Sequence, residues 1–103
     1  MTLSIEKSVV AAGEAIRINI TNAPENIWGI SVELEKLDTD PRPHEKVLAS
    51  IFKEGHTYKI PTGATQSGCY KLWIFLTDAE CAVDVETILI GVGDVGSQLE
   101  AFR

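Results

Sequence analysis

Alternation of apolar and polar residues with a period of two runs through much of this chain, and it constrains the fold more than any other feature. Successive side chains of a β-strand point to opposite faces, so such a segment buries one face and exposes the other. "AIRINIT" places Ile16, Ile18 and Ile20 on one side. The same pattern predicts two further strands, with the inward residues Leu3, Ile5 and Val9 in "LSIEKSVV" and Trp28, Ile30, Val32 and Leu34 in "WGISVELEKL".

Seven extended segments follow one another along the chain, separated by turn residues such as Gly13 and Pro24. Many short strands with regular turns are typical of an all-β sandwich, and the absence of long helical patterns argues against α/β folds. We therefore predict a seven-stranded antiparallel β-sandwich. The irregular stretch "DTDPRPHE" should be an exposed loop, because its two prolines cannot donate to a strand ladder.

One segment, residues 45–53, fits two structures. Val47, Leu48, Ile51 and Phe52 would share one face of a short helix. However, "KEGH" is a good hairpin turn leading into the extended "HTYKIP", so a strand here would complete a hairpin. We favour the strand, with the short helix as the alternative.

The last two segments predict a hairpin that turns at Ala79 and Glu80. If Asp78 faces Cys81, the pairs are Leu72 with Thr87, Ile74 with Val85 and Leu76 with Val83 on the core face, and Lys71 with Ile88, Trp73 with Glu86 and Phe75 with Asp84 on the other. The outer face would carry Trp73, Phe75, Ile88 and Ile90, beside Ser31, Glu33 and Glu35 of the third segment. An apolar centre with an acidic margin is typical of a protein contact surface. The alternative is that the C-terminal residues Leu99 and Phe102 fold back over it.

Composition excludes several classes of function. The 103 residues carry a net charge of −6 with nine scattered Lys and Arg, so we expect no nucleic-acid binding. The beginning of the chain has no signal-peptide pattern and no segment is long and apolar enough to span a membrane, which predicts a cytoplasmic or virion location and no membrane insertion.

The cysteines and acidic residues do not form a recognisable chemical motif. Cys69 and Cys81 should lie at opposite ends of one strand, too far apart for a disulfide. A catalytic cysteine would need His44 or His56 nearby, and both histidines are predicted to lie in loops or at strand ends, so we expect no such pairing. Two groups of potential metal ligands match no calcium-loop spacing and no zinc pattern: Asp38, Asp40 and His44, and Asp78, Glu80 and Asp84. We predict no catalytic residues, no metal, no cofactor and no small-molecule substrate.

The C-terminal half resembles the closing strands of immunoglobulin-like modules of bacterial and phage surface and virion proteins. Gly68-Cys69-Tyr70 matches the Gly-x-Tyr that begins their penultimate strand, and Asp78 matches the start of their last hairpin turn. The resemblance implies an immunoglobulin-like sandwich over residues 1–93 followed by a tail over 94–103. It also implies that the Tyr70 hydroxyl ties the preceding connection back to the sheet.

These observations lead to two functional hypotheses. The first is a non-enzymatic structural or binding module that contacts a protein partner or its own copies through the Trp73 and Phe75 face, for instance as a phage virion decoration or tail-associated component. The second is a carbohydrate- or surface-adhesion module excised from a larger extracellular protein, with the loops "NAPEN", "DTDPRPHE" and "TDAEC" as its rim. Those loops contain no aromatic residue, which a sugar platform would need.

Overall fold

Two β-sheets form the body of the protein. The computed structural model describes residues 1–63 and 65–103. In chain order its strands are β1 (Thr2–Ile5), β2 (Val9–Val10), β3 (Ile16–Thr21), β4 (Gly29–Lys36), β5 (His44–Ile51), β6 (Thr57–Ile60), β7 (Gly68–Thr77) and β8 (Ala82–Val92). A short helix, α1 (Gly96–Leu99), and a 3₁₀ turn, η1 (Glu100–Phe102), follow β8. The all-β prediction is confirmed.

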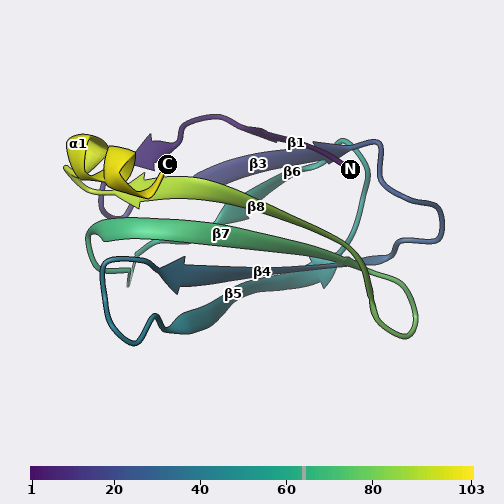
Figure 1. Cartoon of the computed structure of the whole chain (residues 1–103). Coiled ribbons are helices and arrows are strands. Elements are labelled where there is room, and N and C mark those ends of the chain that lie inside the picture. Colours follow the sequence, from purple (N-terminus) through teal and green to yellow (C-terminus); the bar gives the residue numbers. More distant parts are fainter. Residues whose placement is uncertain (64) are drawn as a thin grey trace.

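The strands divide into a sheet of three, ordered β1-β3-β6, and a sheet of five, ordered β2-β8-β7-β4-β5 (Figure 1). Every pairing is antiparallel except that of β2 with β8, which is parallel. The prediction of seven strands, all antiparallel, is corrected at this point. "LSIEKSVV" is not one strand, because β1 pairs with β3 in one sheet and β2 pairs with β8 in the other.

The core fills the space between the two sheets. The strand sides with alternating apolar residues meet there, so that Ile16, Ile18 and Ile20 of β3 are almost completely buried together with the inward side chains of β4 and β7. Buried apolar surface of this kind supplies most of the stability of a small domain, at about 25 cal/mol per Å². The inward residues predicted for β3 and β7 are confirmed. Of the inward residues predicted for the third strand, Trp28 is not buried. It precedes Gly29, the first residue of β4, and 57% of its surface is exposed.

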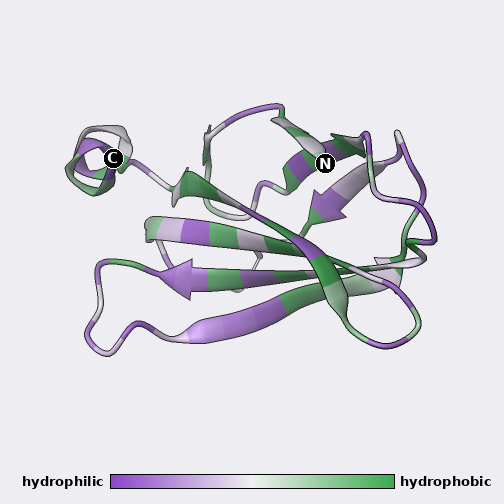
Figure 2. Ribbon diagram, turned by 45° about the vertical axis from the view of Figure 1, so that its right-hand side comes forward, coloured by the Kyte–Doolittle hydropathy of each residue, from purple (hydrophilic) through white to green (hydrophobic). Residues whose placement is uncertain are grey.

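Residues 44–51 form strand β5 rather than a helix, as favoured from the sequence. β5 pairs with β4 alone, and the register shifts between Val32 and Glu33 of β4, so that Val47 is the extra residue on β5. Figure 2 shows that β5 is hydrophilic over its first half and hydrophobic over its second. The strand therefore presents different chemistry at its two ends.

The turn of the last hairpin lies where the sequence predicts it. The backbone N–H of Asp78 donates to the Cys81 carbonyl at 3.1 Å. Asp78 Oδ1 in turn accepts from the backbone N–H groups of Glu80 at 2.8 Å and Cys81 at 3.0 Å. Both bonds favour the charged carboxylate, with the bond from Cys81 the larger cause, and they lower the pKa of Asp78.

The register beyond this turn differs from the prediction by one residue. Thr77 pairs with Ala82, as expected, but Leu76 then pairs with Asp84, so Val83 is an extra residue in a β-bulge. A shift of one residue exchanges the two faces of a strand. The pairs are consequently Leu72 with Ile88, Trp73 with Thr87, Ile74 with Glu86 and Phe75 with Val85.

The Tyr70 hydroxyl closes the corner between β6 and β7. It donates to the Gln66 carbonyl at 2.6 Å, and the ring is buried in the core. This is the bond that the resemblance implied for Tyr70. It ties the connection that precedes β7 to the strand itself.

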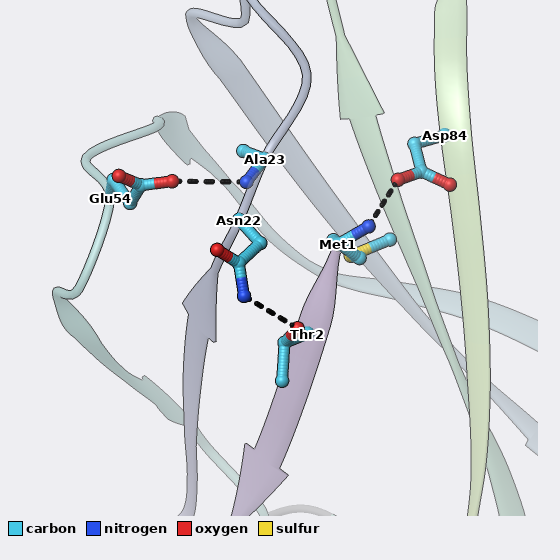
Figure 3. A network of polar contacts seen from close by, with 6 residues as sticks. All are labelled: Met1, Thr2, Asn22, Ala23, Glu54 and Asp84. Atoms are coloured by element: carbon cyan, nitrogen blue, oxygen red, sulfur yellow. Dashed lines mark hydrogen bonds and ion pairs between the residues drawn. The ribbon is translucent and has the colours of Figure 1, made fainter.

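Polar contacts also tie together the other end of the molecule (Figure 3). The terminal ammonium of Met1, next to β1, lies 2.9 Å from Asp84 Oδ2 on β8 and so joins the two sheets. Asn22 has a left-handed φ of 54° at the end of β3, and its Nδ2 donates to Thr2 Oγ1 at 2.9 Å. Within the described part of the chain, no helix is long and apolar enough to cross a membrane.

Candidate functional site

The outer face of the five-stranded sheet carries the aromatic residues singled out from the sequence. Trp73 and Phe75 alternate along β7 with the buried Leu72, Ile74 and Leu76, and both are half-buried on the side away from the core. Trp73 lies between Glu33 of β4 and Thr87 of β8, and Phe75 lies between Ser31 and Val85. The predicted placement of Ser31, Glu33 and Glu35 beside β7 is confirmed.

Ile88 and Ile90 do not belong to this face. Ile90 is 1% exposed and lies in the core, and Ile88 packs against the same core. The bulge at Val83 is the physical reason, because it moves the even-numbered residues of β8 to the inner side. Val85, which was predicted to face the core, takes an outer position beside Phe75 and is 44% exposed.

Trp73 is held by contacts on several sides. Its indole Nε1–H donates to Glu35 Oε1 at 3.1 Å, and its ring stacks on Phe75 with centroids 6.3 Å apart and an interplanar angle of 11°. The Lys71 Nζ lies 5.8 Å from the ring centroid, a cation–π distance, and the His44 ring lies at 5.9 Å. The indole is therefore a fixed part of the surface.

A charged cluster borders Trp73 on the β5 side. His44 Nδ1 lies 3.5 Å from Glu33 Oε1, and His44 Nε2 lies 3.7 Å from Glu35 Oε2. His44 is half-exposed, whereas only 13% of the Glu35 side chain is exposed. The acidic margin predicted from the sequence is thus present, and a histidine lies across it.

The apolar part of the outer face lies on the other side of Trp73, toward the β7–β8 turn. Ala49, Ser31, Phe75 and Val85 form one cross-strand row, and Ile51, Gly29 and Thr77 form the next. Ile51 is 70% exposed. We call Ile51, Ala49, Phe75, Val85 and Trp73 the outer patch.

Three members of the outer patch, Ile51, Ala49 and Val85, were not predicted from the sequence. The signal for Val85 was present in "VDVETILIGV", whose apolar residues change from odd to even positions after Val85. Only one of the two sets can face the core of a regular strand. The longer and bulkier set, Ile88, Ile90 and Val92, is the one that faces the core.

The C-terminal segment folds back on this outer face, but at its opposite end. Leu99 is 1% exposed and packs in a second apolar cluster with Leu37 and Cys69, which Leu89, Val95 and Phe102 border. Gly91 of β8 lets the C-terminal segment lie close to the strand, because a Cβ at this position would lie only 2.8 Å from Val95 Cγ2. The segment thus covers the Cys69 end of the sheet, and the cluster that it forms does not include Trp73 or Phe75.

The two cysteines are both free, Cys69 buried and Cys81 exposed. Burial raises the pKa of the Cys69 thiol, and the nearby Asp38 carboxylate raises it further. His44 lies against Trp73, Glu33 and Glu35. The His56 ring packs edge-on against the Tyr58 ring, with the two ring centroids 4.8 Å apart. Among residues 1–63 and 65–103, no three His, Cys, Asp or Glu side chains are grouped so that they could hold a metal ion.

No protein-family model matches the chain, and no curated protein matches it.

Proposed function

We propose that this protein is a non-enzymatic, immunoglobulin-like structural or binding module that acts through protein–protein contact at the outer patch. Three features support the immunoglobulin-like assignment. The first strand, β1, belongs to the three-stranded sheet and the second, β2, to the five-stranded sheet. In addition, β7 lies between β8 and β4, and the Tyr70 hydroxyl closes the corner before β7. The setting, a phage virion decoration or tail-associated component, is part of the proposal and rests on the sequence resemblance.

The outer patch is the observation that carries the functional part of the proposal. Ile51 and Val85 are exposed, and Phe75 and Trp73 are half-buried. On β4, between Ile51 of β5 and Phe75 of β7, the outer positions are taken by the small residues Gly29 and Ser31. Contiguous apolar surface with a rigid aromatic centre and a charged rim is the usual composition of a protein interface. The internal contacts of Trp73 keep this surface ordered before any partner arrives, which lowers the entropy cost of binding.

The proposal is tested by placing one charge in the outer patch. In Val85→Asp the new carboxylate should abolish contact at the patch, because it would lose its hydration in the interface. The matched control is Thr57→Asp, which adds the same charge at an exposed strand position of the three-stranded sheet. Self-association is measured by sedimentation equilibrium, and binding to candidate partner proteins by calorimetry.

We expect Val85→Asp to lose the association that Thr57→Asp retains. A chain that stays monomeric at every concentration, and whose Val85→Asp and Trp73→Ser variants bind each candidate partner like the wild type, would contradict the proposal.

A further inference from the structure

Three connections meet at the end of the sandwich away from the C-terminal segment (Figure 1). They are the β3–β4 loop (22–28), the β5–β6 turn (52–56) and the β7–β8 turn (78–81). Glu54 Oε1 accepts from the backbone N–H of Ala23 at 3.0 Å, which joins the first two (Figure 3). The backbone N–H of Trp28 donates at 3.2 Å to the carbonyl of Thr77, the last residue of β7, which holds the first connection beside the start of the third. We call these three connections the loop end.

Trp28 is the dominant side chain of the loop end. Its backbone is fixed at both polar groups, since its carbonyl also accepts from the Phe52 N–H at 2.8 Å, yet its side chain is left 57% exposed. The ring borders an open hollow of about 540 Å³, whose lining is Asn26, Ile27, Trp28, Asp78, Ala79 and Glu80. An exposed tryptophan on a backbone held at both polar groups, beside a hollow, is available to stack against a ligand.

The charge of the loop end selects the ligand. The three connections carry four carboxylates, Glu25, Glu54, Asp78 and Glu80, against one lysine, Lys53, and one histidine, His56. Asp78 and Glu80 lie on the hollow itself. The backbone hydrogen bonds that lower the pKa of Asp78 keep this residue charged over a wide pH range. A negative hollow with an aromatic wall favours a cation.

We propose that the loop end binds an arginine side chain presented by a basic protein segment. The guanidinium would stack on the Trp28 ring and direct its N–H groups to the carboxylates of Glu80 and Asp78, a combination that lysine satisfies less well because its ammonium is a point charge. The net charge of −6 would speed the approach of such a segment. This site is separate from the outer patch and does not depend on the proposed function.

A neutral sugar is the competing ligand. The rim loops "NAPEN", "DTDPRPHE" and "TDAEC" contain no aromatic residue, and Trp28, just beyond "NAPEN", supplies one ring. A sugar would use that ring, but it would gain little from the excess of carboxylates around it. The charge of the hollow therefore favours the cation.

The two indole N–H signals of the full chain in nuclear magnetic resonance spectra, one from Trp28 and one from Trp73, show where a ligand binds. The affinity of each variant is measured by calorimetry, because Trp28→Ala lacks the Trp28 signal. The probe is a blocked peptide of alternating glycine and arginine. The comparison ligands are the same peptide with glutamine in place of arginine, and a neutral gluco-oligosaccharide. The variants are Trp28→Ala and Glu80→Gln, with Glu100→Gln, an exposed residue of η1 at the other end of the molecule, as the matched control.

We expect the arginine peptide to shift the Trp28 signal and leave the Trp73 signal in place. Trp28→Ala should weaken binding about five- to tenfold and Glu80→Gln about two- to threefold, with added salt weakening it further. Glu100→Gln should bind like the wild type. Equal binding of the glutamine peptide, a Trp28 shift produced by the oligosaccharide alone, or arginine-peptide binding unchanged in Trp28→Ala would each overturn the proposal.

Discussion

Leu99→Ala provides a direct test of how the C-terminal segment is held. Leu99 is 1% exposed, so almost its whole side chain is removed from water against Leu37 and Cys69. Burying a leucine completely is worth about 1.5–3 kcal/mol, and buried Leu→Ala changes cost about 2–5 kcal/mol when a cavity remains. The value should lie near the lower limit, about 2 kcal/mol, because a chain end can leave its site instead of enclosing a cavity.

The same substitution should expose Cys69. If the free energy that holds the C-terminal segment on the sheet falls by about 2 kcal/mol, the population of molecules with this segment undocked rises about 30-fold. Alkylation of Cys69 should accelerate by a similar factor in a Cys81→Ser background, which removes the exposed thiol. Urea unfolding gives the stability loss, and mass spectrometry gives the alkylation rate.

Leu72→Ala is the control for the alkylation experiment. Leu72 is fully buried between the sheets, so its truncation should cost about 4 kcal/mol. This loss affects global unfolding and leaves the docking of the segment unchanged. An alkylation rate in Leu99→Ala equal to that of the parent, or a loss of stability well below 1 kcal/mol, would refute the packing described for Leu99.

Two other predictions follow from the last hairpin. Ile90→Asp should prevent folding, because it would bury an unpaired carboxylate, whereas Val85→Asp should lower the free energy of unfolding by about 1 kcal/mol or less. Thermal melts followed by circular dichroism measure both effects. The reverse order of the two variants would support the register predicted from the sequence. The Asp78 carboxylate has a lowered pKa and so contributes stability above its ordinary pKa of 3.8, a contribution that is lost as the pH falls through the folded-state value. The stability deficit of Asp78→Ala relative to wild type should therefore shrink below pH 3.8, and a deficit that stays constant in acid unfolding experiments would contradict this assignment.

Local patterns were sufficient to predict most of the strands. Ile16, Ile18 and Ile20 alternate without a break, and the structure buries all three between the sheets. The hydrogen bond of Tyr70 was anticipated through the resemblance to immunoglobulin-like modules, which implies it for a tyrosine near the start of this strand. Period-two alternation reports directly which side of a strand faces the core, so it needs no knowledge of the neighbours.

The candidate site was only partly predictable, because it depends on one extra residue. The position of Trp73 and Phe75 follows from β7 alone, but the partners on β8 depend on the bulge at Val83. The one mark of the bulge in the sequence is the change of the apolar residues from odd to even positions after Val85, which the assumption of a regular strand passes over. The misassignment of Ile88 and Ile90 to the outer face follows from that omission.

Features set by distant contacts were beyond the reach of the sequence pattern. Trp28 continues the alternation of β4, yet it lies beyond the end of the sheet where no core remains to receive it. The docking of Leu99 depends on Gly91, where the missing side chain leaves room for Val95. Both depend on where elements end in space, which period-two alternation does not encode.

The parallel pairing of β2 with β8 has a mechanical consequence. Val9 pairs with Gly91 and Val10 with Val92, and the N–H groups of Gly91 and Gly93 donate to the carbonyls of Ser8 and Val10, each at 2.8 Å. The chain enters β2 from its N-terminal side and leaves β8 on its C-terminal side, so a force pulling the two ends apart slides these strands along each other. Both hydrogen bonds are then loaded together in shear instead of opening one after the other.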